Sequence, residues 1–136
     1  MGFRLAAIFT HNTSLEAKAL QQWPGCYVKE VKKYHLLGIA AHPDLTFQAT
    51  KEDKKRALRM KKELPAWSSQ FPDDTFVFIE VNCHGGDCLN EGYAVKNQKL
   101  LHKQEPSAHG HQELLTYLGI TLDKQYFVAF TDGFFE

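Results

Sequence analysis

The stretch from Thr75 to Lys103 constrains the fold more than any other part of the chain. It contains three runs of β-prone residues, 75–83, 88–96 and 99–103, separated by Gly85-Gly86 and Asn97-Gln98. Paired glycines adopt the positive φ angles that a two-residue hairpin turn requires, so the stretch predicts a three-stranded antiparallel meander. The same turn fixes the register, with His84 opposite Asp87 and Cys83 opposite Cys88.

This register predicts an acidic surface on the hairpin. Extending the pairing places Glu80 opposite Glu91, and like charges that face each other in a sheet are destabilising unless something compensates them. Water, a nearby Lys or Arg, a shared proton, or an external cation or basic partner could do so. Alternation assigns Val77, Ile79, Val81, Gly92 and Ala94 to the core, and the opposite face to Phe78, Glu80, Asn82, Glu91 and Tyr93.

The remaining segments predict an α+β fold in one domain, residues 1–136. Strands are expected over 3–9, 26–31 and 34–41, a helix that begins at a capping box of Thr13 and Glu16, and a second that begins at Thr50 and Asp53 and ends at Pro65. The order is βαββαβ, the ferredoxin-like arrangement, followed by a β-hairpin and a short helix over 111–118. We expect an antiparallel or mixed sheet with helices packed on one face; a plain meander with packed helices is the alternative.

Composition favours a compact protein of ordinary type. Of the 136 residues, 43% are hydrophobic and 24% charged, close to the averages for globular domains. The apolar run Leu5–Phe9 is too short for a signal peptide, and no run approaches the roughly 20 residues of a membrane span. We therefore expect a cytoplasmic protein with reduced cysteines and no membrane partner.

Charge is unevenly distributed although the formal net charge is zero. Residues 51–70 carry seven basic and three acidic side chains, whereas residues 71–136 carry four and ten. This asymmetry suits either neutralisation of the two regions within the folded domain or attraction of a charged partner. On the second interpretation the acidic hairpin binds a basic protein through Glu80, Glu91, Asn82 and Asp87, with Phe78 and Tyr93 as anchors. A solvated surface is the simpler alternative.

The sequence Cys83-His84-Gly85-Gly86-Asp87-Cys88 allows several chemistries. Reduced cysteines on the buried side of the hairpin are the favoured interpretation, because free cysteine behaves as a small hydrophobe. A reversible disulfide, a zinc site on Cys83, His84 and Cys88, and a cysteine nucleophile are the alternatives. A zinc site would need a further ligand, such as His102, His109 or His111.

Two other regions could bind ligands. The helix from Lys51 to Leu64 has basic residues around most of its circumference and could contact nucleic acid, although no aromatic residue lies among them to stack on bases. His109-Gly110-His111 with Glu113 lacks the spacing of known zinc motifs. No phosphate loop, nucleophile elbow or dinucleotide fingerprint occurs, so an enzyme is not favoured.

About half of the chain resembles small uncharacterised bacterial proteins. The similarity lies in Ile79–Cys88, Glu91-Gly92-Tyr93, Tyr117-Leu118-Gly119 and Thr131–Phe135. In size and lack of catalytic motifs the chain is also similar to the immunity proteins with which bacteria neutralise toxins. This second similarity implies a non-catalytic inhibitor of a basic toxin, such as a nuclease, and identifies no site residue.

Overall fold

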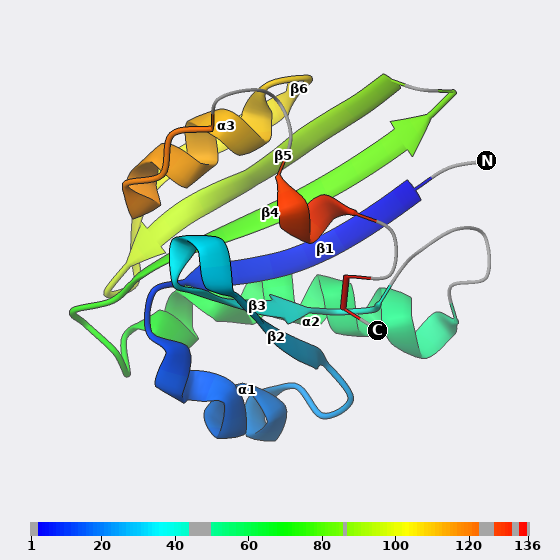
Figure 1. Ribbon diagram of the computed structural model, residues 1–136. Helices are drawn as coiled ribbons and strands as arrows, with labels where there is room; N and C mark the ends of the chain where they lie inside the picture. The colour runs from blue at the N-terminus through cyan, green and yellow to red at the C-terminus, as the bar shows by residue number, and fades with distance from the viewer. Residues whose placement is uncertain (1–2, 44–49, 86, 123–126, 132–133, 136) are drawn as a thin grey trace.

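The protein folds around one six-stranded antiparallel sheet with the order β2-β3-β1-β4-β5-β6 (Figure 1). The computed structural model describes residues 3–43, 50–85, 87–122, 127–131 and 134–135. The elements are β1 (Phe3–Thr10), α1 (Glu16–Gln22), β2 (Tyr27–Val31), β3 (Leu36–Ala40), α2 (Lys51–Ser68), β4 (Thr75–His84), β5 (Asp87–Lys96), β6 (Lys99–Ser107) and α3 (Gly110–Leu115). The predicted single-domain α+β class is confirmed.

The first six elements have the ferredoxin-like arrangement expected from their order. β3 lies between β1 and β2, β4 pairs with the other side of β1, and all four strands are antiparallel to their neighbours. The added strands β5 and β6 extend the sheet beyond β4. The predicted turns are also present, because Asn97 and Gln98 have φ angles of 48° and 67° and Gly119 ends the α3 region at 74°.

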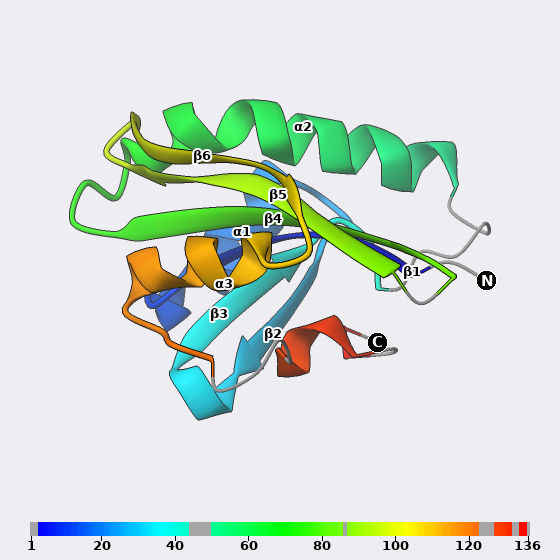
Figure 2. The ribbon, with the colours of Figure 1, turned by 90° about the horizontal axis from the view of Figure 1, so that it is seen from above.

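Helices cover both faces of the sheet. The two helices of the ferredoxin-like core, α1 and α2, lie on one face as predicted, whereas α3 and the C-terminal segment lie on the other (Figure 2). The four inner strands β1, β3, β4 and β5 therefore present buried apolar residues in both directions, as a sheet covered on both sides requires. The prediction that helices pack on one face alone was incomplete, because periodicity in a strand does not indicate what covers its second face.

Two hydrophobic cores hold these layers together. Under α1 and α2, the core includes Trp23, Met60, Leu64, Trp67 and Phe76, and the ring of Trp67 lies 4.9 Å from that of Trp23. On the opposite face, aromatic residues of the C-terminal segment join the core, led by Phe127, whose ring lies 5.2 Å from that of Phe9. The aromatic tail is thus core where it is described, as expected.

The helix starts agree only in part with the predictions. The capping box at Thr50 and Asp53 is confirmed in both directions, with hydrogen bonds of 3.1 and 3.3 Å. The first helical segment begins differently, because Asn12 accepts the hydrogen bond from the Ser14 amide at 3.2 Å. Asn12 is therefore the cap, and the predicted box of Thr13 with Glu16 was wrong; asparagine competes well for this position.

Helix α2 continues through Pro65 to Ser68, so the predicted end at that proline was wrong. A proline inside a helix cannot donate to the carbonyl four residues earlier, here that of Lys61. The hydroxyl of Tyr93 donates to this carbonyl instead, at 2.5 Å. The tertiary contact satisfies the acceptor that Pro65 leaves free, and the apolar residues beyond it, including Trp67, keep the helix on the sheet.

Candidate binding site

The sheet face under α2 changes from apolar to charged as it approaches the β4–β5 turn. Three rows of directly paired residues cross β1, β4 and β5 on this face: Ile8, Phe78 and Tyr93; Ala6, Glu80 and Glu91; Arg4, Asn82 and Leu89. The predicted pairing of Glu80 with Glu91 is confirmed. The fully buried residues of α2 begin only at Met60, so the N-terminal half of the helix lies over the two charged rows with only the partly buried Ala57 packed against the core.

A pocket of about 230 Å³ lies between this half of α2 and the sheet. Its polar lining comes from four separate parts of the chain: Arg4 of β1, His42 after β3, Lys54 of α2, and Glu80, Asn82 and Glu91 of the β4–β5 hairpin. Ala6, Ala57 and Leu58 are among its apolar residues. We call this the charged pocket.

Lys61 compensates the face-to-face glutamates. Its ammonium lies 2.9 Å from Oε1 of Glu80, and both side chains are partly exposed. The hydrogen bond to Glu80 raises the pKa of Lys61 above its ordinary value, with Glu91 adding to this and burial opposing it. A nearby lysine was one of the compensations anticipated for this pair. Among the residues described, Glu91 itself has no ion-pair partner within 4.0 Å.

His42 is the buried polar group of the pocket. It is 1% exposed, and its Nδ1 atom has no hydrogen-bond partner in the described part of the chain. Burial lowers the pKa of its imidazole to about 4, and the charges of Arg56 and Arg4 lower it further, against the opposing effect of Asp53. The ring is therefore neutral near pH 7. A buried nitrogen without a partner is costly, and such groups concentrate where a ligand can satisfy them.

Three solvent-exposed groups near His42 also have no partner within the described residues. Within the described ranges, the side chains of Arg4, Lys54 and Asn82 make no hydrogen bond or ion pair, although all three line the charged pocket. Convergent polar groups without internal partners are typical of a binding site rather than of a structural network. Sequence reasoning missed Arg4, His42 and Lys54, because only the sheet topology brings β1, β3 and α2 to the hairpin. The one indication in the sequence was Arg4, a charged residue that strand alternation places on the same face of β1 as Ala6 and Ile8.

The predicted aromatic anchors do not lie at a surface. Phe78 is 0% exposed and Tyr93 9% exposed, and their rings stack at 5.6 Å beneath α2. The prediction that Phe78 and Tyr93 anchor a partner was wrong, because a helix covers the face that alternation assigned to solvent. Asp87 is exposed beside the turn, opposite His84, and does not line the pocket.

The two hairpin cysteines form a disulfide. Cys83 and Cys88 are bonded, with their Cα atoms 4.0 Å apart, at the directly paired position that the register predicted. The favoured interpretation of a reduced pair was therefore wrong, and the disulfide alternative is the one observed. The zinc hypothesis for Cys83, His84 and Cys88 also loses its thiolates. In the part of the chain that the structure describes, no three His, Cys, Asp or Glu side chains are grouped to hold a metal ion.

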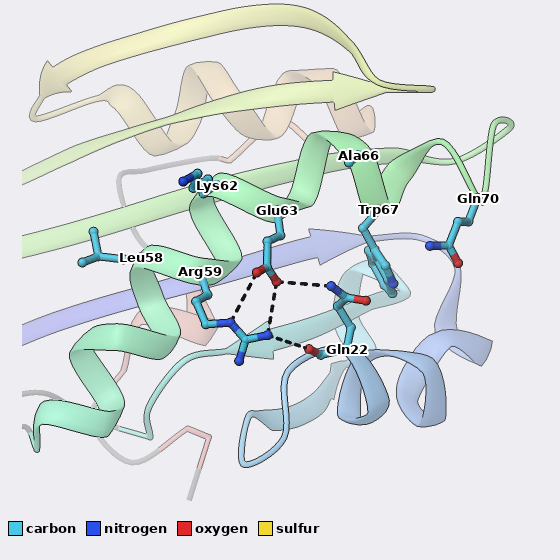
Figure 3. Close-up of a pocket in the computed structure, with 8 residues that line it drawn as sticks. All are labelled: Gln22, Leu58, Arg59, Lys62, Glu63, Ala66, Trp67 and Gln70. Atoms are coloured by element: carbon cyan, nitrogen blue, oxygen red, sulfur yellow. Dashed lines mark hydrogen bonds and ion pairs between the residues drawn. The ribbon is translucent and has the colours of Figure 1, made fainter.

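A larger hollow lies between α1 and α2 but is chemically different. It measures about 740 Å³ and is lined by residues that include Gln22, Arg59, Glu63 and Trp67 (Figure 3). Its acid, Glu63, accepts hydrogen bonds from Arg59, Gln22 and the Trp23 indole at 3.3, 3.2 and 2.9 Å. Burial opposes ionisation, but these donors outweigh it and hold the pKa of Glu63 below its ordinary value. The carboxylate here is therefore satisfied by neighbouring donors of the protein itself.

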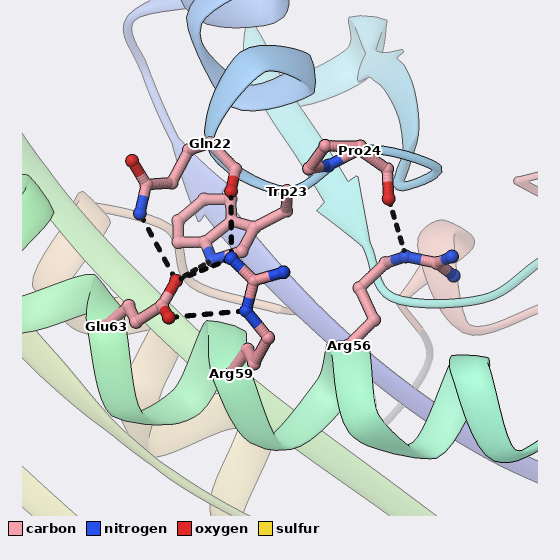
Figure 4. Close-up of polar contacts among 6 residues, drawn as sticks. All are labelled: Gln22, Trp23, Pro24, Arg56, Arg59 and Glu63. Carbon is pink, nitrogen blue, oxygen red and sulfur yellow. Dashed lines mark hydrogen bonds and ion pairs between the residues drawn. The ribbon is translucent and has the colours of Figure 1, made fainter.

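Hydrogen bonds from arginines of α2 to other parts of the chain occupy part of the basic surface of this helix (Figure 4). Arg56 donates to the Pro24 carbonyl at 3.1 Å and to the Ala41 carbonyl at 2.8 Å, and Arg59 donates to the Gln22 carbonyl at 3.4 Å. With Lys61 paired to Glu80, these residues join the basic helix to the rest of the domain. Neutralisation within the fold therefore accounts for part of the charge asymmetry. Nucleic-acid binding by this helix stays an untested prediction.

Comparisons with known proteins identify no relative. No family model matches the chain, and neither the curated proteins nor the solved structures contain a significant match. Within its described residues, the protein also contains no helix with the length and apolar character needed to cross a membrane. The site must therefore be interpreted from its own geometry.

Proposed function

We propose that this chain is a non-catalytic binding protein, of the immunity type, that captures a basic protein through Glu80, Asn82 and Glu91. The observation that carries the proposal is the cross-strand pair of Glu80 and Glu91, in which Lys61 is within ion-pair distance of Glu80 while Glu91 has no such partner among the residues described. A lysine or arginine of the partner would supply the second cation. Close charge pairs of this kind can couple strongly across an interface.

Exposed apolar side chains beside the pocket take the place of the anchors first expected. Leu58 is 69% exposed on α2, and Leu89, which pairs with Asn82, is 51% exposed on β5. Large exposed leucines on either side of a charged pocket suit a small interface with an apolar rim and a charged centre. In such an interface the leucines contribute buried area, while the glutamates provide orientation and long-range attraction.

The partner can be sought with a matched pair of charge variants. The wild type, Glu80→Gln/Glu91→Gln and a control Glu16→Gln/Glu30→Gln are immobilised and exposed to a lysate of the source organism. Glu16 and Glu30 are exposed on α1 and β2, so the control changes the net charge equally outside the pocket. We expect one basic protein to be retained by the wild type and the control and to bind the pocket variant at least about tenfold more weakly.

Salt dependence provides the second measurement. The pocket variant should also lose part of the decrease in affinity with ionic strength, because two charges have been removed from the interface. If the pocket variant and the control retain the partner equally, Glu80 and Glu91 do not contribute to its binding. If the wild type retains no basic protein at low salt, the proposal fails.

A bacterial, cytoplasmic location belongs to this proposal as well. The disulfide between Cys83 and Cys88 argues against it, because the cytosol keeps most thiols reduced. Alkylation of the protein in intact cells, followed by a count of modified cysteines, distinguishes the locations. Denaturation in the presence of the reagent also exposes the buried Cys26. If this is the one cysteine that is modified, the disulfide exists in the cell.

A further inference from the structure

The charged pocket has two ends of opposite sign. Glu91 lies on β5, and Glu80 and Asn82 lie on β4, at the centre of the rows. Arg4 pairs with Asn82 from the other side, so it lies on the opposite flank of β4 from Glu91. His42 is on the same flank as Arg4, since the preceding Ala41 donates to the Ala6 carbonyl at 2.9 Å. Sheet spacing places the Cα atoms of Arg4 and Glu91 about 12 Å apart.

The positive end is independent of the glutamate pair. Arg4 provides an exposed cation without a partner in the described residues, Lys54 provides a second in the same lining, and the buried Nδ1 of His42 is a third polar atom without a partner. An isolated cationic ligand would satisfy only Glu80 and Glu91 and would be repelled by this end. An isolated anion would meet the reverse difficulty. The full lining is complementary only to a group that carries both charges.

The size of the pocket limits that group to a single residue. Pockets for drug-sized ligands measure about 300 to 1,000 Å³, whereas this one measures about 230 Å³. Ala57 and Leu58 also line it and can contact an aliphatic chain. A basic amino-acid residue with a free carboxylate has this composition: an anion, a short aliphatic chain and a terminal cation.

We propose that the charged pocket binds a lysine or arginine residue through its free α-carboxylate as well as its side chain. The carboxylate would lie at Arg4, Lys54 and His42, and the ammonium or guanidinium between Glu80 and Glu91. Resting on the proposed function, this identifies the captured group as the C-terminal basic residue of the partner. The free amino acid carries the same chemistry, and the experiment separates the two sources.

Four probes measured by titration calorimetry test the inference on the intact protein. They are a short acetylated glycine-rich peptide ending in lysine, its C-terminal amide, the same peptide ending in norleucine, and free lysine. The carboxylate peptide should bind at least about tenfold more tightly than either the amide or the norleucine peptide. Tighter binding of the peptide than of free lysine identifies a chain terminus as the ligand; the reverse identifies the free amino acid.

Single substitutions test which end of the pocket binds the carboxylate of the peptide and which end binds its side-chain cation. In Arg4→Gln the preference for carboxylate over amide should disappear while the preference for lysine over norleucine persists, and Glu91→Gln should show the opposite pattern. Lys51→Gln, on α2 outside the pocket lining, is the control and should retain both preferences. In nuclear magnetic resonance titrations, the midpoint of His42 should rise when the carboxylate peptide is bound, because a nearby anion favours the protonated ring.

The outcomes separate this inference from the proposed function. Equal binding of carboxylate and amide would overturn the carboxylate assignment and leave capture of a basic side chain intact. No binding of any probe below about 10 mM would overturn the inference as a whole. The retention experiment with the Glu80→Gln/Glu91→Gln variant would then decide the proposed function by itself.

Discussion

The two halves of helix α2 lie over the same sheet face but differ in the side chains that they contact there. The C-terminal half buries Met60, Leu64 and Trp67 against aromatic residues of β4 and β5. The N-terminal half covers Arg4, Glu80 and other charged or polar side chains that line a pocket. Since both halves belong to one continuous helix, the packed half positions the other half, whose apolar contact with the core is limited to the partly buried Ala57.

This division explains how the protein retains the buried, unpartnered Nδ1 atom of His42. A polar group removed from water without a partner costs on the order of 1 to 3 kcal/mol. A domain tolerates a few such groups only when burial elsewhere supplies the stability, as the buried aromatic cluster around Trp67 does under the same helix. The comparison therefore predicts that substitutions in the two halves have different consequences.

The largest expected effect is that of Trp67→Ala. The Trp67 ring is 4% exposed and lies 4.9 Å from the ring of Phe71 and 5.5 Å from that of Phe76. Removing it should lower the free energy of unfolding by about 3 to 5 kcal/mol, because it leaves a cavity in both the helix interface and the core. Leu58→Ala, on the exposed side of the other half, should change it by no more than about 0.5 kcal/mol.

Urea denaturation of the two variants measures this difference. The midpoint of Trp67→Ala should shift strongly at a similar m-value, and that of Leu58→Ala should stay near the wild type. Similar losses in both variants would mean that the N-terminal half also gains stability by packing on the sheet. The proposed pocket would then be part of the core.

The sequence predicts local features better than it predicts what covers them. The Gly85-Gly86 turn and the alternation of β4 fixed the register that places Glu80 opposite Glu91, and Thr50 with Asp53 fixed a helix start. Phe78 was placed on the correct face, yet its burial depends on α2, which periodicity within a strand cannot position. Pro65 misled for a similar reason, because the donor that replaces its missing N–H comes from β5.

The candidate site shows the same limit. Half of its polar lining, the Glu80, Asn82 and Glu91 group, follows from one hairpin and was predicted. Arg4, His42 and Lys54 come from segments that are distant in sequence and meet through the strand order β3-β1-β4 and the crossing of α2. The element order implied this topology, but placing a helix over the far end of the sheet requires the packing of Trp67 and its neighbours.

The second effect is a pH dependence that belongs to the charged half. Because the pKa of His42 falls to about 4 in the folded protein from 6.5, the unfolded chain binds a proton in that interval and the folded protein does not. Stability should therefore fall as the pH decreases from about 6.5 to 4, by about 2 kcal/mol between pH 7 and 5 and on the order of 3 kcal/mol overall.

His42→Asn isolates this contribution from the other titrating groups. The variant removes the imidazole, while the charges that face it, Arg4, Arg56 and Asp53, stay in place. Denaturation at pH 7 and pH 5 should show a smaller loss in the variant than in the wild type, whatever its stability at pH 7. Equal losses would mean that His42 titrates normally and is accessible to water in the folded protein.

The smallest effect tests the boundary between the two halves, where Tyr93 donates to the Lys61 carbonyl that Pro65 leaves free. Tyr93→Phe should lower the free energy of unfolding by about 1 to 2 kcal/mol, because a buried acceptor loses its donor. Pro65→Ala restores a backbone N–H that can donate to the same carbonyl, so in that background the cost of Tyr93→Phe should decrease to about 0.5 kcal/mol. Additive effects in this double-mutant cycle would instead show that the contribution of the Tyr93 hydroxyl does not depend on the acceptor that Pro65 leaves free, and that the continuation of α2 beyond Pro65 depends on the packing of Leu64 and Trp67.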